Sequence, residues 1–237
     1  MSNGSGYVTV KVSDGTEMNA YVAHPSGAGP HPAIMVFQDG FGVNASSRPA
    51  ADRYAGQGFV AIAPELFHRT AVGFEGSYDD FDTVMPHIRA LTTEGLIADV
   101  TASFEWLRAQ RDVNATQIAA VGFCMGGRTA YLANSALPLA ASISYYGGSI
   151  APGLLDRAPQ LHGPQLFFWG GQDKGIPPEQ RRAVADAVSA AGKQFVNVVF
   201  SNANHGFFTA HRHEPAAARE SWALSMAFLG DALGLGG

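Results

Sequence analysis

Apolar and polar residues alternate in two short segments near the N-terminus. Residues 7–12 and 18–23 both show this pattern, and the glycine-containing turn 13–15 lies between them. Strict alternation is typical of a half-buried strand, and two such runs around a short turn predict an antiparallel hairpin. A continuous apolar run at 33–37 follows and predicts a strand that is buried on both faces.

Most of the remaining chain alternates between short apolar runs and segments with helical spacing. We predict strands at 59–63, 118–121, 140–145, 165–169 and 196–200, and helices at 48–57, 97–110, 127–134, 178–191 and 215–233. Strands that alternate with helices indicate βαβ units with right-handed crossovers. The pattern therefore predicts an α/β fold, with a mostly parallel central sheet and helices on both faces. No linker-like change in composition divides the chain, so we expect a single domain over residues 1–237.

One long segment does not follow this alternation. Residues 67–94 are polar and contain two glycines, Pro86 and an acidic cluster at 79–82. We expect an irregular excursion from the sheet that borders a substrate pocket as a mobile lid; a purely structural excursion is the alternative.

Composition and charge exclude several classes of protein. The net charge is −5 and the mean hydropathy is +0.02, which argues against nucleic acid or an anionic membrane as the main partner. The N-terminus lacks the pattern of a secretory signal, and no apolar run reaches the ~18 residues of a membrane span. A single cysteine excludes an intrachain disulfide. Because free thiols persist most easily in the cytoplasm, we expect that location.

That cysteine, Cys124, lies in the sequence Gly122-Phe123-Cys124-Met125-Gly126, between a predicted strand and a predicted helix. Glycines two residues before and after a nucleophile let the strand and helix approach closely, as in a nucleophile elbow. The positive end of the following helix favours a thiolate and, later, an oxyanion. A buried structural cysteine is the alternative, but the glycine spacing favours a nucleophile.

A thiol nucleophile needs a base, and the base needs a residue that orients it. In an α/β-hydrolase the chain order is nucleophile, acid, histidine. Asp173 follows the strand 165–169 and His205 follows the strand 196–200, and the carboxyl ends of parallel strands hold the sites of open α/β sheets. We therefore expect a triad of Cys124, Asp173 and His205. The segment 211–214 contains two histidines and a glutamate, but we expect no metal and no cofactor.

Four blocks of sequence resemble the dienelactone hydrolase family: residues 37–44, 63–69, 121–127 and 204–207. The cysteine in the elbow, where most α/β-hydrolases have serine, is the most specific feature. The resemblance covers nearly the whole chain and implies the α/β-hydrolase fold without a large cap domain. It also implies the same triad and an oxyanion hole formed by the backbone N–H groups of Met125 and Gly40.

The chain departs from the family pattern at positions that affect substrate choice. The family usually has glutamate where this chain has Asp39, and that glutamate holds the resting cysteine until substrate binds. An arginine that helps bind the substrate carboxylate is Thr209 here. We consider Asp39 a candidate gating residue and Arg69 and Arg212 candidate anion contacts. Four phenylalanines either line an apolar pocket or belong to the hydrophobic core: Phe41, Phe67, Phe207 and Phe208.

The motifs together predict a hydrolase that cleaves a small-molecule lactone or ester through a cysteine nucleophile. A broad carboxylesterase or thioesterase with the same triad is the nearest alternative. A ligand binder or thiol sensor on the same scaffold is an alternative of a different class. We expect a monomer or a homodimer.

Overall fold

The computed structural model describes residues 4–45 and 47–235. Eight strands form one sheet in the order β1-β2-β4-β3-β5-β6-β7-β8. The pairs that join β3 to β4, β6 to β7 and β7 to β8 are parallel, which confirms the predicted α/β class with a mostly parallel sheet. The chain divides into two compact units, residues 1–119 and 120–237. The single domain over residues 1–237 stays a prediction.

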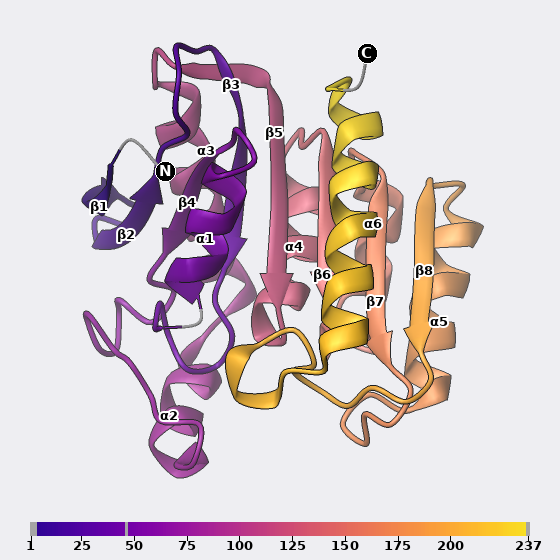
Figure 1. Cartoon of the computed structure of the whole chain (residues 1–237). Helices are drawn as coiled ribbons and strands as arrows, with labels where there is room; N and C mark the ends of the chain where they lie inside the picture. The colour runs from indigo at the N-terminus through magenta and orange to yellow at the C-terminus, as the bar shows by residue number, and fades with distance from the viewer. Residues whose placement is uncertain (1–3, 46, 236–237) are drawn as a thin grey trace. The chain divides into compact units, whose positions relative to one another are not determined.

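The first unit begins with the predicted hairpin, β1 (Ser5–Lys11) and β2 (Glu17–Ala23), which pair antiparallel. β2 continues antiparallel to β4 (Val60–Pro64), and β3 (His31–Phe37) lies parallel to β4. Helix α1 (Ser47–Ala55) lies in front of these strands in Figure 1 and α3 (Thr93–Arg108) behind them. All five residues of β4 are buried, as expected for a strand covered on both faces.

Within the segment 67–94, the prediction of irregular structure was wrong for residues 81–90. They form helix α2 (Phe81–Ala90), although Pro86 lies inside it. The Asp80 side chain accepts a hydrogen bond from the Thr83 N–H (3.3 Å) and caps the helix, and Val84 is fully buried. The N-cap and the buried side chain outweigh the one helical hydrogen bond that proline cannot make.

The second unit contains the regular βα alternation. Its elements are β5 (Val113–Phe123, which starts in the first unit), α4 (Met125–Ala136), β6 (Ala141–Tyr145), β7 (Gln165–Gly170), α5 (Pro178–Ala190), β8 (Phe195–Phe200) and α6 (Pro215–Leu233). Two short 3₁₀ helices, Leu155–Gln160 and Ala210–Arg212, lie outside the predicted elements. Figure 1 shows α6 in front of β6 and β7, and α4 and α5 behind the strands. β6 and β7 are completely buried, including the rings of Phe167 and Phe168, whereas the edge strand β8 is partly exposed along its whole length.

The register of β7 and β8 positions the loops that follow them. Gly170, the last residue of β7, lies opposite Phe200, the last residue of β8. Because the two strands are parallel and end at the same level, the loops after them leave the sheet side by side. Among the helices that the structure describes, none combines the length and the apolar character needed to cross a membrane.

Candidate active site

Cys124 lies at a sharp turn between β5 and α4. Its φ of 56° and ψ of −116° belong to a region that residues other than glycine rarely adopt. The Cys124 N–H donates to the Tyr145 carbonyl (3.0 Å), and the Cys124 carbonyl accepts from the Gly127 N–H (2.9 Å). The side chain is a free thiol and is partly exposed. A strained backbone thus presents a thiol at the start of a helix, as a nucleophile elbow requires.

Gly122 explains why this turn can be so tight. A Cβ atom on Gly122 would overlap the carbonyl oxygen of Gly126, because the helix starts directly against the end of the strand. The backbone is also crowded at Gly127, where a Cβ atom would lie 2.7 Å from the Tyr145 carbonyl oxygen. Backbone packing therefore explains why residues 122 and 127 are glycines.

Asp173 and His205 form a hydrogen-bonded pair, as the sequence predicts. His205 Nδ1 donates to Asp173 Oδ2 over 2.7 Å. The Asp173 side chain is 3% exposed, whereas that of His205 is 29% exposed. The other Asp173 oxygen, Oδ1, accepts from the Gly175 N–H (2.8 Å). The buried carboxylate is thus fixed on both oxygens and holds a partly exposed imidazole.

The loops after β7 and β8 approach each other closely enough to form this pair. A Cβ atom on Gly171 would overlap the Ser201 carbonyl oxygen, so only glycine allows the two backbones to pack directly. The Gln172 N–H donates to the Ala203 carbonyl (2.9 Å) and ties the loops together. Arg181 of α5 donates to the Gly170 carbonyl. These contacts align Asp173 with His205.

The pKa values of this pair follow from burial and from charge. Burial lowers the pKa of His205, but the hydrogen bond with Asp173, the adjacent Cys124 side chain and the charge of Asp173 outweigh this effect and raise it to about 10. Burial raises the pKa of Asp173, and the hydrogen bond and charge of His205 outweigh this effect and hold it below its usual value. The Asp173 carboxylate on its Nδ1 side therefore makes His205 more basic than an ordinary histidine.

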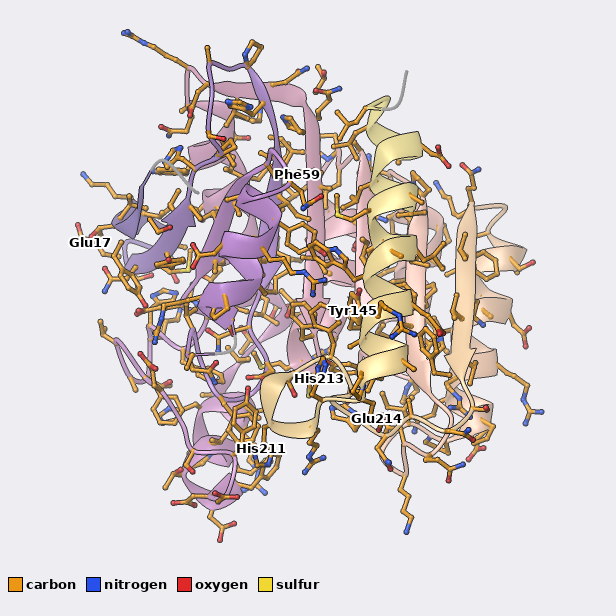
Figure 2. The ribbon with its side chains drawn as sticks, in the orientation of Figure 1. Glu17, Phe59, Tyr145, His211, His213 and Glu214 are labelled. Carbon is orange, nitrogen blue, oxygen red and sulfur yellow. The ribbon has the colours of Figure 1, made fainter. Side chains whose placement is uncertain are left out.

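Aromatic residues pack beside the histidine. The rings of Tyr146 and His205 lie 5.0 Å apart, and Tyr146 has a φ of 39°, a second left-handed residue next to the site. Phe207, a candidate substrate contact, is fully buried against Tyr146 and Phe200. Its position agrees with the core alternative that the sequence leaves open. Tyr145, labelled in Figure 2, packs between Phe123 and Phe168 in the same cluster.

Sequence analysis missed Glu214, which holds the histidine loop. Its carboxylate Oε1 accepts from the Asn204 N–H (2.8 Å), and its own N–H donates to the Phe207 carbonyl (2.9 Å). Glu214 directly precedes Pro215, the first residue of α6. Its place before a predicted helix was the only feature of the sequence that could have indicated this structural role.

Figure 2 labels Glu214 together with His211 and His213. Within residues 4–45 and 47–235, no three His, Cys, Asp or Glu side chains lie close enough together to form a metal site. Arg212 is exposed on the same short helix.

The candidate gating residue, Asp39, lies in the first unit directly after β3. It is 5% exposed. Its Oδ2 accepts from the Tyr78 hydroxyl (2.7 Å), and its Oδ1 accepts from the Phe41 N–H (2.9 Å). The rings of Phe41 and Tyr78 lie 4.2 Å apart. Gly40 packs below Ile88 of α2, where a Cβ atom would come within 2.9 Å of the isoleucine side chain. Ile88 thus fills the space that a side chain at position 40 would occupy.

Arg69, a candidate anion contact, is engaged by two carboxylates. Its two terminal nitrogens bind both oxygens of Asp99 (2.8 Å each), and its Nε donates to Asp14 (2.8 Å). Asp99 is completely buried and also binds His68 Nε2 (3.1 Å). This network fixes the guanidinium within the first unit. An additional role for Arg69 in binding a substrate anion stays a prediction.

Comparison with known proteins agrees with this geometry. The family model described as "Dienelactone hydrolase family" matches residues 18–233. The chain belongs to the dienelactone hydrolase family. A carboxymethylenebutenolidase of Pseudomonas putida is 29% identical over 186 residues, which cover 77% of this chain and 78% of that protein. A protein of Escherichia coli K12, provisionally named a carboxymethylenebutenolidase, is 33% identical over 223 residues, covering 89% of this chain and 81% of its own length.

Solved structures show the same family. A crystal structure from Klebsiella pneumoniae, provisionally titled a dienelactone hydrolase, superimposes with a TM-score of 0.87 at 28% identity. The match covers 96% of this chain and 98% of that one. This dienelactone hydrolase family member is therefore an enzyme that hydrolyses lactones or carboxylic esters and acts on a small-molecule substrate.

Proposed function

We propose that the enzyme cleaves its lactone or ester by acyl transfer through Cys124, with His205 as acid and base and Asp173 as the residue that orients His205. The observation that carries this proposal is the 2.7 Å hydrogen bond from His205 Nδ1 to Asp173 Oδ2. It leaves Nε2 of the same ring for the Cys124 side chain, with which His205 also forms a hydrogen bond. The strained backbone at Cys124 supports the nucleophile role.

In the first half of the reaction, Cys124 attacks as a thiolate while His205 carries the proton. A pKa raised to about 10 makes His205 a strong acceptor, so it can take the Cys124 proton as the sulfur attacks. The carbonyl carbon gains the sulfur, and its oxygen becomes an oxyanion. Met125 is the first residue of α4, so its N–H has no helical acceptor and can donate to that oxyanion. The Gly40 N–H is proposed as a second donor, and one such donor contributes ~3 kcal/mol.

In the second half, the thioester returns to free enzyme. The intermediate expels the alkoxide or enolate, which takes the proton from His205. Neutral His205 then removes a proton from water, and the hydroxide attacks the thioester carbon. The C–S bond breaks, the carboxylic acid is released, and the Cys124 sulfur takes the proton back from His205. The leaving group must not return to the thioester. An enol-lactone favours this outcome because its enolate leaving group is stabilised.

A substrate panel and three variants test the proposal. We expect purified enzyme to turn over an enol-lactone and a chromogenic ester. We expect Cys124→Ala and His205→Gln to reduce kcat by at least ~10³-fold and Asp173→Asn by a smaller factor. Electrospray mass spectrometry of the wild type with a slow ester should detect an adduct that the Cys124→Ala variant lacks. Full turnover by the Cys124→Ala variant would exclude the cysteine mechanism.

A second candidate, a broader esterase for substrates without a carboxylate, is favoured by the position of Arg69. Its guanidinium is bound by Asp99 and Asp14, and Thr209 replaces the arginine usual in the family. Phe81, at the start of α2, is 54% exposed and packs edge-on against Phe41. Rates for pairs of esters with and without a carboxylate decide between the two: a preference for the neutral member supports the broader esterase.

We also propose a cytoplasmic location, which rests on the free thiol of Cys124. A monomeric or homodimeric state, the gating role of Asp39 and a pocket-bordering role for residues 67–94 remain parts of the same proposal. Size-exclusion chromatography with light scattering would measure the oligomeric state directly.

A further inference from the structure

A cavity of about 250 Å³ lies within the first unit, between the N-terminal hairpin and the chain that follows β4. Its walls include Tyr7, Asn19, Val43, Glu65 and Phe74. All of these residues belong to residues 1–119, and none of them has a part in the proposed triad. At ~30 Å³ per water molecule the cavity holds about eight waters, so it fits a small organic molecule rather than a drug-sized one.

Glu65 gives this cavity its chemical character. The residue is only 7% exposed, and it lines the cavity. Its Oε2 accepts from the Gly73 N–H over 3.0 Å, whereas its Oε1 has no hydrogen-bond donor in the part of the chain that the structure describes. This oxygen can therefore accept a hydrogen bond from a cationic ligand in the cavity.

The second carboxylate that lines the cavity, Glu75, is bound by an arginine. Glu75 accepts from both terminal nitrogens of Arg48, at 2.6 Å and 3.2 Å. Arg48 NH1 also donates to the Tyr7 hydroxyl at 3.3 Å. The Glu75 charge is thus balanced within the protein, and Glu65 carries the uncompensated negative charge.

The remaining walls favour an organic cation over a metal ion. Tyr7 and Phe74 provide aromatic surface, which attracts an ammonium group, and Val43 provides apolar surface for a short carbon chain. A calcium or magnesium ion needs about six oxygen ligands. The cavity offers one carboxylate oxygen without a donor, and the side-chain oxygen of Asn19 already accepts from the Thr9 hydroxyl (3.3 Å). A primary ammonium needs only a few acceptors and matches this supply.

We propose that this cavity binds a small primary alkylammonium ion, with Glu65 as the counter-ion and Tyr7 and Phe74 as the apolar walls. The proposal does not depend on the proposed catalytic function, because both its residues and its test lie outside the triad.

The test compares n-butylammonium with n-butanol in ¹H–¹⁵N NMR titrations of the full chain. We expect saturable shifts of the Asn19, Gly73 and Glu75 amides, with butanol binding about tenfold more weakly because it lacks the charge. The variant Glu65→Gln keeps the shape and an acceptor for the Gly73 N–H, and it should lose most of the preference for the ammonium. Glu17→Gln is the matched control, since Glu17 is exposed at the outer end of β2 (Figure 2) and should change nothing.

The wild-type comparison alone can overturn the proposal. Equal binding of ammonium and alcohol, shifts confined to another surface, or no saturable shift at all would each exclude an ammonium site here. Retained preference in a folded Glu65→Gln variant would remove Glu65 from it. Should Glu65→Gln fail to fold, Phe74→Leu tests the same cavity, because loss of an aromatic wall should weaken ammonium binding more than butanol binding.

Discussion

Tyr78 donates its hydroxyl hydrogen to Asp39, with 2.7 Å between Oη and Oδ2. The donor comes from the segment before α2 and the acceptor from the end of β3, so a side chain of the excursion fixes the candidate gating carboxylate. The Phe41 ring packs against Tyr78 at a tilt of 40° and helps hold the hydroxyl in place. Within the first unit, the orientation of Asp39 therefore depends on the position of the segment that carries Tyr78.

We expect Tyr78→Phe to lower the free energy of unfolding by about 2 kcal/mol, because a nearly buried carboxylate loses a donor. The matched control is Tyr21→Phe, which removes a hydroxyl bonded to the more exposed Asp52 at 3.0 Å and should cost about 1 kcal/mol or less. Urea unfolding of both variants measures the difference. Equal losses would show that the contact between Tyr78 and Asp39 is no stronger than a surface hydrogen bond.

The tight turn at Cys124 predicts that one added methyl group at Gly122 destabilises the protein. Gly122→Ala should destabilise the protein by about 3 kcal/mol or more, because its Cβ would overlap the Gly126 carbonyl oxygen. Gly230→Ala is the control, since Gly230 lies in α6 with open space around it and should gain up to about 1 kcal/mol from better helix propensity. Thermal melts of the two variants should shift in opposite directions. A Gly122→Ala variant as stable as the wild type would contradict the tight turn.

The protonation state of His205 can be measured directly. A pKa of about 10 predicts an imidazolium at pH 8, where an ordinary histidine is neutral. Cys124→Ala and Asp173→Asn each remove a group that raises the His205 pKa, so each should lower it. Imidazole ¹⁵N chemical shifts across a pH titration report this value. A wild-type midpoint near 6.5 would contradict the predicted ion pair.

The same pKa shift predicts how stability depends on pH. The folded-state pKa of His205 is raised above its unfolded value of about 6.5. Its contribution is therefore complete below about pH 6.5 and is lost as the pH rises toward 10. The wild type should thus lose its stability advantage over His205→Gln between these two pH values. Chemical unfolding at pH 6, 8 and 10 measures the difference, and a constant difference would contradict the linkage.

Glu214 is predicted to be a positioning residue. Glu214→Ala frees the Asn204 N–H next to His205, and we expect kcat to fall about tenfold with little change in KM, because the base loses its alignment. Glu214→Gln keeps an acceptor oxygen and should restore most of the activity. If Glu214→Ala changes KM alone, or if Glu214→Gln is as impaired as Glu214→Ala, the residue does not act through the position of the loop.

Local patterns in the sequence predict most elements of this fold. Apolar runs with turns at their ends give the strands, and α6 has the predicted bounds, because Pro215 and Gly234 mark the start and end of a helix in the sequence itself. The glycines around Cys124 predict the elbow for the same reason, since they constrain residues only a few positions away. Sequence analysis missed helix α2 because Pro86 argues against a helix. The contacts that stabilise α2, the Asp80 cap and the burial of Val84, form only when the chain folds.

Contacts between residues far apart in the sequence depend on the tertiary structure. The order of strand ends suggests that Asp173 and His205 meet, but only the register that places Gly170 opposite Phe200 and the contact between the two loops bring them to 2.7 Å. The hydrogen bonds of Arg69 to Asp99, of Glu214 to Asn204 and of Tyr78 to Asp39 have no local signal, since any of these side chains could face solvent. Sequence thus determined the fold class and the tight turn at Cys124 through short-range sterics and periodicity. The tertiary structure decided which charges are paired, because pairing requires packing of distant segments.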